Sequence, residues 1–137
     1  MRNVLKQVKL LLLDVDGILT DGRIIYDNQG NECKTFDVKD GHGLKLLQRA
    51  GLEVGIITGR KSQAVSRRAK ELGIEILYQD IKDKMVPFLE ILALRGLRAD
   101  EVAYMGDDLV DLPLLKRVGF PRQSLMPWKT SSLLSII

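Results

Sequence analysis

The chain is poor in the residues that would mark several common classes of protein. It has one cysteine, Cys33, which excludes an internal disulfide and fits a reducing cytoplasm. Aromatic residues make up only 5% and do not alternate with basic ones, so a net charge of +3 suits a small anion better than nucleic acid. The apolar run Val8–Leu13 is too short to cross a membrane and lacks the pattern of a signal peptide. We therefore expect a cytoplasmic protein with no membrane or nucleic-acid partner.

What is present is an ordinary globular composition, with 45% hydrophobic and 28% charged residues over 137 positions. There are no repeats, linkers or low-complexity tracts, and the length suits one domain over 1–137. Apolar strand-like runs alternate with helical segments, which predicts an α/β fold, a Rossmann-like three-layer structure with a parallel sheet between helices. The expected core strands are 8–15, 53–58, 75–78 and 101–105, and the expected helices are 41–50 (capped by Asp40), 62–72, 83–95 and 111–118.

A β-hairpin insertion is predicted after the first strand. Segments 22–26 and 32–38 flank the turn-rich sequence Asp27-Asn28-Gln29-Gly30-Asn31, and Cys33 is an ordinary strand residue there.

The first strand ends in two carboxylates, Asp14 and Asp16, followed at once by Gly17. We expect the chain to turn as it leaves the strand, so that both acids can serve one ligand at the end of the sheet. Glycine permits that turn. Two close acids repel each other, so a cation or a shared proton is expected between them.

Further polar groups follow the other predicted core strands. They are Thr58-Gly59-Arg60 after the second, Lys84 after the third, and Gly106-Asp107-Asp108 with Asp111 after the fourth. Ligands of open α/β sheets bind at this edge. Carboxylates with water and phosphate oxygens suit Mg²⁺, while a threonine, backbone amides and a lysine suit a phosphoryl group. The residues themselves thus predict a Mg²⁺-dependent phosphoryl-transfer site.

The motifs Asp14-x-Asp16-Gly17-x-x-Thr20, Thr58, Lys84 and Gly106-Asp107-Asp108-x-x-Asp111 occur in an order that resembles the haloacid dehalogenase superfamily. Within it, Leu19-Thr20-Asp21-Gly22, Asp40-Gly41-His42-Gly43, Ile56-Ile57-Thr58-Gly59-Arg60-Lys61 and Leu77-Tyr78-Gln79 resemble the capless 3-deoxy-D-manno-octulosonate 8-phosphate phosphatases. The resemblance covers about residues 8–119.

The resemblance implies roles for individual residues. Asp14 is the expected nucleophile, forming an aspartyl-phosphate, and Asp16 the expected acid and base. Mg²⁺ is expected on the Asp14 and Asp107 carboxylates and the Asp16 carbonyl. The phosphate-binding residues would be Thr58, Gly59 and Lys84, with Arg60 on the sugar carboxylate and Asp108 and Asp111 in support.

The implied reaction is hydrolysis of a phosphorylated sugar acid, 3-deoxy-D-manno-octulosonate 8-phosphate, in lipopolysaccharide precursor synthesis. A nine-carbon sugar-acid phosphate is the alternative substrate, since phosphate-binding groups serve many esters. In the resembled family the hairpin packs between subunits of a homotetramer that roofs the site. His42 is more simply a helix-start residue than a base. A receiver-type signalling domain uses similar groups, but its acceptor acid usually ends a middle strand.

The tail 120–137 departs from the family pattern and shows no clear strand or helical face before its last apolar residues. Codons permitted for this stretch, read from the third base of each codon, can encode Ser-Val-Ala-Asn-Ala-Val-Glu-Asp-Val-Lys-Ser-Ala-Glu-Tyr, which resembles the family tail. We hypothesise that a frameshift replaced the native C-terminus. A catalytically impaired remnant is therefore a further alternative to an active phosphatase. The homotetramer is expected only if the altered tail permits it. The gene sequence tests this, because a frame without a family-like tail would contradict it.

Overall fold

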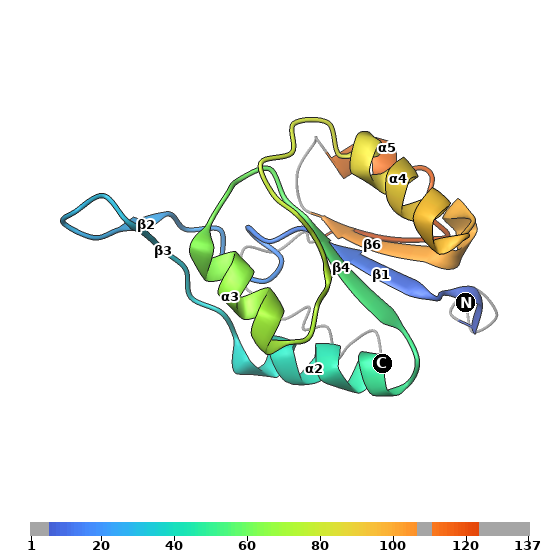
Figure 1. Cartoon of the computed structure of the whole chain (residues 1–137), viewed down its shortest axis with the longest axis horizontal. Helices are drawn as coiled ribbons and strands as arrows, with labels where there is room; N and C mark the ends of the chain where they lie inside the picture. Colours follow the sequence, from blue (N-terminus) through green and yellow to red (C-terminus); the bar gives the residue numbers. More distant parts are fainter. Residues whose placement is uncertain (1–5, 107–110, 124–137) are drawn as a thin grey trace.

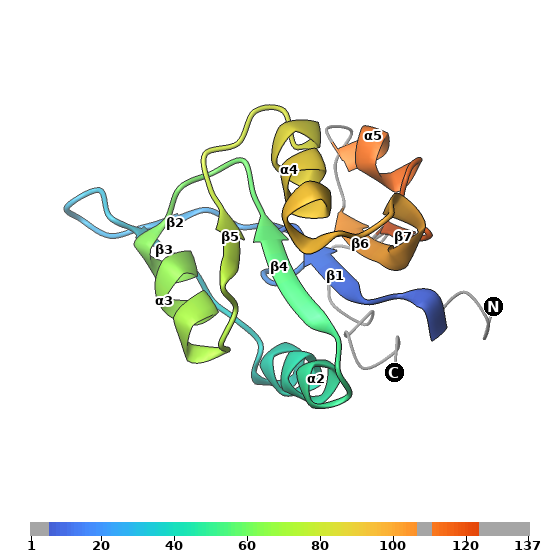
Figure 2. The same cartoon turned by 45° about the vertical axis from the view of Figure 1, so that its right-hand side comes forward.

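A parallel sheet flanked by helices is the frame of the molecule. The computed structural model describes residues 6–106 and 111–123. The five-stranded sheet has the order β5-β4-β1-β6-β7, which Figure 2 shows from edge to edge. Its strands are β1 (Leu10–Leu13), β4 (Glu53–Ile57), β5 (Ile76–Tyr78), β6 (Val102–Gly106) and β7 (Phe120–Gln123). The helices are α2 (Val38–Arg49), α3 (Gln63–Glu71), α4 (Met85–Arg95) and α5 (Leu112–Leu115), with a 3₁₀ turn at Ala99–Glu101.

Helices cover both faces of the sheet, with α2 and α3 on one side and α4 and α5 on the other (Figure 1). The four consecutive leucines of β1 serve both layers because alternate side chains point to opposite faces. Leu11 and Leu13 pack with Leu44 of α2, whereas Leu10 and Leu12 pack with Phe88 of α4. This explains why the first strand reads as an unbroken apolar run, as strands buried on both faces do. The α/β, three-layer expectation is confirmed.

The order of the strands in the sheet distinguishes the haloacid dehalogenase-like expectation from the receiver-domain alternative. Numbered along the chain, the parallel strands lie in the order 3-2-1-4-5, because β1 pairs with both β4 and β6. Receiver domains have the flavodoxin-like order 2-1-3-4-5. The acids that follow β1 therefore lie at the central strand, where the direction of the strand order reverses and ligands of such sheets bind.

The predicted hairpin lies between β1 and α2. Its strands β2 (Ile25–Tyr26) and β3 (Glu32–Cys33) pair antiparallel, and the hairpin projects away from the sheet (Figure 1). At its turn, the Asp27 carboxylate accepts hydrogen bonds from the backbone amides of Gln29 and Asn31. These bonds explain why the turn-rich segment closes here.

Two expectations are wrong. The first helix begins at Val38 and not at 41, because Asp37 acts as its N-cap and accepts a hydrogen bond from the amide of Lys39 at 2.8 Å. Asp40, the expected cap, is buried within the first turn. His42 consequently lies inside the helix, where it is exposed.

The second correction concerns the tail, whose first residues form a strand. β7 (Phe120–Gln123) pairs in parallel with β6 at the outer edge of the sheet. The unpaired edge of β6 offers a row of backbone donors and acceptors to any following segment. Pro121, which lacks an amide hydrogen, is tolerated because β7 is an edge strand. Residues 124–137 lie outside the described residues.

Across the two described stretches, none of the helices combines the length and apolar character needed to span a bilayer.

Candidate active site

The chain turns sharply as it leaves β1, as the sequence predicts. Backbone amides of residues 18, 19 and 20 all donate to the carbonyl oxygen of Val15, and Gly17 adopts a φ of 83°. The Thr20 hydroxyl accepts a hydrogen bond from the amide of Gly17 at 3.3 Å. Because of this turn, Asp16 does not continue the strand that carries Asp14, and the two acids meet different partners.

Asp14 is a buried carboxyl group. Its Oδ1 accepts the Val15 amide at 2.8 Å and its Oδ2 lies 3.2 Å from Lys84 Nζ. Burial is the largest influence and raises the pKa of Asp14 to about 6, with the Lys84 charge lowering it and the Asp111 charge raising it. The positive charge of Lys84 does not fully offset the cost of burying the ionised Asp14 carboxylate. An additional cation near Asp14 would therefore be favourable.

Lys84, at the start of α4, connects the acid of β1 to the opposite side of the site. Its ammonium lies 2.6 Å from Asp111 Oδ1 and 3.2 Å from the Tyr104 hydroxyl, and its side chain is 3% exposed. Tyr104 also hydrogen-bonds Asp111. The ordering of β1 explains the convergence, since Asp14 shares the sheet face of Leu10 and Leu12, against which α4 and α5 pack.

Asp111 reaches Lys84 because Gly106 leaves room at the end of β6. A Cβ at Gly106 would overlap the Asp111 carboxyl group. Asp111 precedes α5 as expected, but its side chain makes no capping hydrogen bond there. It partners Lys84 and Tyr104 instead, so its place near the helix start serves the site.

A second lysine, Lys34, holds the second acid. Lys34 Nζ lies 2.7 Å from Asp16 Oδ1 and 2.9 Å from Glu32 Oε1. Glu32 Oε2 in turn lies 3.2 Å from an Arg60 Nη. Arg60 and Asp16 are among the residues that the sequence predicts for the site, whereas Lys34 and Glu32 are not. Their spacing of two in the expected strand segment 32–38 was the available clue, because it predicts that both lie on one face of the hairpin, although β3 itself ends at Cys33.

Arg60 thus joins the hairpin rather than standing alone after β4. Hydrogen bonding to Tyr26, followed by the bond and charge of Glu32, holds the pKa of Arg60 above its usual range. The Arg60 side chain remains 43% exposed, so one side of the guanidinium is open to a ligand.

Thr58 and Gly59 lie where the sequence places them, directly after β4. Thr58 is buried, and its amide donates to the carbonyl of Tyr78 at 2.9 Å while its carbonyl accepts from Ile81. Leu13 of β1 pairs with Ile56, so Thr58 lies just beyond the level of Asp14 on the neighbouring strand. The strand register therefore brings both to one edge of the sheet.

The expected metal ligand Asp107 and the supporting acid Asp108 lie outside the described residues. Within 6–106 and 111–123, no group of three acid, histidine or cysteine side chains could hold a metal ion. The described part of the site offers the Asp14 carboxylate and the Asp16 backbone carbonyl. These are oxygen donors of the kind that hard divalent cations select, so the donor set fits such a cation.

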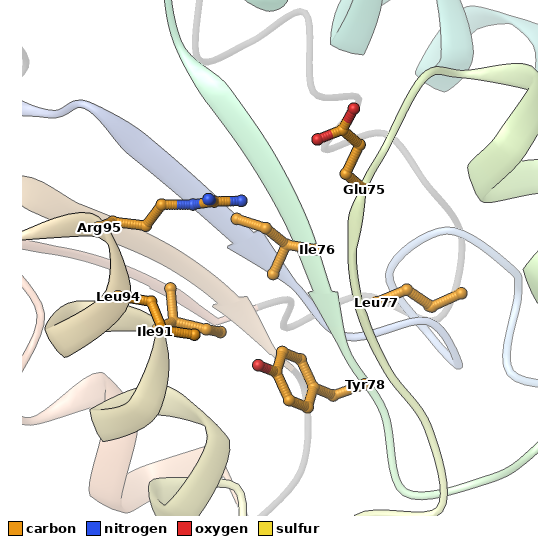
Figure 3. Close-up of a pocket in the computed structure, with 7 residues that line it drawn as sticks. All are labelled: Glu75, Ile76, Leu77, Tyr78, Ile91, Leu94 and Arg95. Atoms are coloured by element: carbon orange, nitrogen blue, oxygen red, sulfur yellow. The ribbon is translucent and has the colours of Figure 1, made fainter.

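A separate pocket of about 200 Å³ lies between β5 and α4 (Figure 3). In it Ile76 and Tyr78 of β5 point toward Ile91 of α4. None of its lining residues is a predicted site residue, so it is distinct from the cluster at the strand ends. Cys33 is exposed in the hairpin.

Fold and site together define an α/β protein with acids after the central strand of its parallel sheet, and comparison with known proteins gives the family. No family model matches the chain. The 3-deoxy-D-manno-octulosonate 8-phosphate phosphatase KdsC of Yersinia pestis is 46% identical over 112 residues, which is 82% of this chain and 60% of that protein. The chain therefore spans about three fifths of the length of this relative.

Solved structures agree. A probable YrbI family phosphatase of Pseudomonas syringae matches with a TM-score of 0.83 and 47% identity, over 87% of this chain and 69% of that one. The Moraxella catarrhalis 3-deoxy-D-manno-octulosonate 8-phosphate phosphatase, solved with a magnesium ion, a phosphate ion and a KDO molecule, matches with a TM-score of 0.82 and 44% identity over 88% and 71%. A Legionella pneumophila structure, described as a putative haloacid dehalogenase superfamily (subfamily III A) hydrolase, matches with a TM-score of 0.83 and 47% identity over 85% of this chain and 64% of that one. The chain belongs to the 3-deoxy-D-manno-octulosonate 8-phosphate phosphatase family of that superfamily.

Proposed function

We propose that this protein is a Mg²⁺-dependent phosphatase that hydrolyses 3-deoxy-D-manno-octulosonate 8-phosphate to the free sugar acid and phosphate, in the synthesis of lipopolysaccharide precursors. The observation that carries the proposal is the buried Asp14 carboxylate at the end of the central strand, with Lys84 Nζ 3.2 Å away. An acid in this place can attack phosphorus while the ammonium attracts the phosphoryl oxygens.

Asp14 is the nucleophile of the proposed reaction. One of its carboxylate oxygens attacks phosphorus, the bond from phosphorus to the sugar oxygen breaks, and Asp16 gives its proton to that leaving oxygen. Water then attacks the aspartyl-phosphate, Asp16 takes the proton of the water, and phosphate departs to regenerate Asp14. The covalent intermediate divides one difficult displacement into two easier ones.

Mg²⁺ would be held by the Asp14 carboxylate, the Asp16 carbonyl and Asp107, and when bound it neutralises charge on the phosphoryl oxygens. The raised pKa of Asp14 supports this assignment, because an ionised and desolvated carboxylate gains most from a nearby cation.

Thr58, the backbone at Gly59 and Lys84 are the proposed phosphate-binding groups. Lys84 contacts the nucleophile and Thr58 lies at the neighbouring strand end. Asp111 keeps the Lys84 ammonium in place from the far side, 2.6 Å away. Asp108 would support the same region. Arg60 is proposed for the substrate carboxylate, since guanidinium binds carboxylate through two parallel hydrogen bonds and the Arg60 side chain is 43% exposed.

We further propose a cytoplasmic homotetramer in which the hairpin of one subunit packs against a neighbour, provided that the tail permits it. Ile24, Ile25 and Tyr26 expose large apolar surfaces on the hairpin. Such a cluster favours a protein contact.

Phosphate release from 3-deoxy-D-manno-octulosonate 8-phosphate tests the proposal. We expect release with Mg²⁺, loss of release with chelator, and a loss of at least about a thousandfold in Asp14→Asn, because the nucleophile is removed. Release that continues in Asp14→Asn would contradict the assigned chemistry. A folded wild type that releases phosphate from a nine-carbon sugar-acid phosphate alone would correct the substrate, and one that releases none from either would contradict the proposed function.

A further inference from the structure

Lys34 is a charged residue buried in the hairpin next to the proposed site. Its side chain is 2% exposed, although ammonium groups are seldom taken out of water without strong compensation. Compensation comes from Asp16 at 2.7 Å and Glu32 at 2.9 Å. Asp16 is 18 positions away in the sequence. The contact therefore fixes the hairpin to the end of β1.

The exposures of the partners differ in an informative way. The Glu32 side chain is 15% exposed and bonds both Lys34 and Arg60, so it acts as an internal bridge. The Asp16 side chain is 28% exposed, and Lys34 holds its Oδ1. One part of this carboxylate is anchored and another part remains open to a ligand or to water.

The two acids at the end of β1 are held by different lysines. Lys84 approaches Asp14 from the α4 side, whereas Lys34 approaches Asp16 from the hairpin. Separate cationic partners keep two neighbouring carboxylates in separate orientations, which a shared partner would not do. An exchange of proton with a leaving oxygen needs hydrogen-bond reach, so the orientation of Asp16 decides how well it acts.

We propose that Lys34 is a positioning residue for Asp16, and that Glu32 links it to Arg60 so that the sugar end of the substrate and the acid–base group are held as one unit. This rests on the proposed function. Lys34 itself need not touch the substrate. It holds Asp16 so that its proton reaches the sugar oxygen when the bond to phosphorus breaks, and so that Asp16 receives the proton of the attacking water afterwards.

A pair of substrates separates positioning from a general structural role. The sugar oxygen is a poor leaving group that needs the proton of Asp16, whereas the nitrophenolate of p-nitrophenyl phosphate leaves without one. Both substrates form the same aspartyl-phosphate, whose hydrolysis again needs Asp16. A fault confined to Asp16 therefore slows the first step for the sugar phosphate alone, and the second step for both.

The experiment measures rapid-quench first turnovers and steady-state rates, with Mg²⁺, for the full chain and for Lys34→Met. We expect first-turnover cleavage of the sugar phosphate to fall about a hundredfold, in the range that general acid–base groups contribute. First-turnover release of nitrophenolate should change less than about threefold, and it should be followed by slow turnover, which appears as a burst of one equivalent. Lys39→Met, which changes an exposed lysine of α2, is the matched control and should behave as wild type.

Lys34→Arg keeps the charge and serves if Lys34→Met does not fold. The informative quantity is the first-turnover rate on the sugar phosphate divided by that on p-nitrophenyl phosphate. For Lys34→Arg this ratio should lie between the ratios of wild type and Lys34→Met. If Lys34→Met is unfolded, the ratio of Lys34→Arg should lie below that of wild type. Equal losses on both substrates, or a ratio unchanged from wild type in the folded variants, would overturn the positioning role. A wild type inactive on both substrates would instead contradict the proposed function.

Discussion

The ammonium of Lys84 lies 2.6 Å from the carboxylate of Asp111, and their side chains are 3% and 0% exposed. Lys84 directly precedes α4 and Asp111 directly precedes α5, so the pair connects the starts of two helices on the same side of the sheet near the end of β1. A buried ion pair is costly to break, because without Asp111 the Lys84 ammonium keeps only the Asp14 carboxylate, 3.2 Å away, as a charged partner among the described residues, in a region of low dielectric constant.

Asp111→Asn should therefore lower the free energy of unfolding by about 3 kcal/mol, the lower end of the range for breaking a buried ion pair, because Lys84 keeps Asp14 as its partner. Tyr104→Phe removes the hydroxyl that donates to the same carboxylate and accepts from Lys84, but it leaves the two charges paired, so it should cost less, about 1–2 kcal/mol. Equilibrium unfolding in urea at pH 7 measures both. Equal costs for the two variants would show that charge pairing is not what stabilises this corner of the sheet.

The pKa of Asp14 predicts how stability varies with pH in metal-free protein. Burial raises this pKa from 3.8 to about 6, so the folded state binds more protons than the unfolded state between these values. The contribution of Asp14 thus favours folding at low pH and is lost as the pH rises through about 6. The loss amounts to at most about 3 kcal/mol.

Asp14→Asn removes that group, so unfolding free energies of wild type and variant should diverge with pH. With chelator present, the unfolding free energy of the variant minus that of wild type should increase from pH 4 to 7 and stay constant above pH 7. Comparing the two chains at each pH cancels groups such as Glu32, whose pKa the Lys34 bond lowers. A difference that stays constant from pH 4 to 7 would show that Asp14 titrates normally.

Metal affinity should have its own pH dependence. If Mg²⁺ binds the ionised Asp14, its binding below pH 6 must displace a proton. Affinity measured by calorimetry should then fall about tenfold per unit as the pH decreases below about 6, and level off above it. Affinity that is the same at pH 5 and pH 7 would exclude Asp14 as a ligand that titrates in this range.

The sequence supported the convergence of Asp14, Thr58 and Lys84 because parallel strands end at a common edge, and strand ends can be recognised from apolar runs. It did not reveal Tyr104 as a partner of Lys84, since a tyrosine in a core strand looks like any packing residue. Lys34 and Glu32 were missed for a different reason. From the sequence alone, charged residues of a hairpin such as Glu32 and Lys34 are expected to face solvent. Only the tertiary fold places them next to Asp16.

The errors in the fold have local causes. Asp37 and Asp40 are equally suitable caps by residue type, and the choice between them depends on which one has the extended backbone of an N-cap. β7 has no alternation to recognise and contains Pro121, but the open edge of β6 supplies the pairing partner. Strand formation at an edge thus depends on the neighbour more than on the segment itself.

Gly106 is predicted to be intolerant of a side chain. In Gly106→Ala the new methyl group overlaps the Asp111 carboxyl, so either the acid or the end of β6 must move. We expect a loss of about 1–3 kcal/mol, typical of overpacking, with a fall in turnover because Lys84 loses its support. Gly30→Ala is the comparison, since at φ 81° with open space around it the cost is backbone strain and turnover should be kept. Unchanged turnover in Gly106→Ala would contradict the close approach.

Arg60 should affect the sugar acid more than the phosphate. In the proposed role, Arg60→Gln would remove a charge-assisted pair with the substrate carboxylate, so KM for the sugar phosphate should rise about 10–100-fold. The KM for p-nitrophenyl phosphate, which carries no carboxylate, should change less than about twofold. Arg67→Gln alters an exposed arginine of α3 and is the matched control. An equal rise on both substrates would place Arg60 at the phosphate instead.

The apolar surface of the hairpin is the last feature whose consequence can be measured. Ile24 is 52% exposed on a segment that projects from the sheet, where a side chain of this size favours a protein contact. Ile24→Asp should therefore dissociate the proposed tetramer, because each interface would bury an unpaired carboxylate. Val86→Asp changes an equally apolar exposed residue on α4, away from the hairpin, and should leave the assembly intact. Sedimentation gives the mass of both variants. A mass that falls in Val86→Asp but not in Ile24→Asp would move the interface from the hairpin to α4, and with it the part of the neighbour that could close the site.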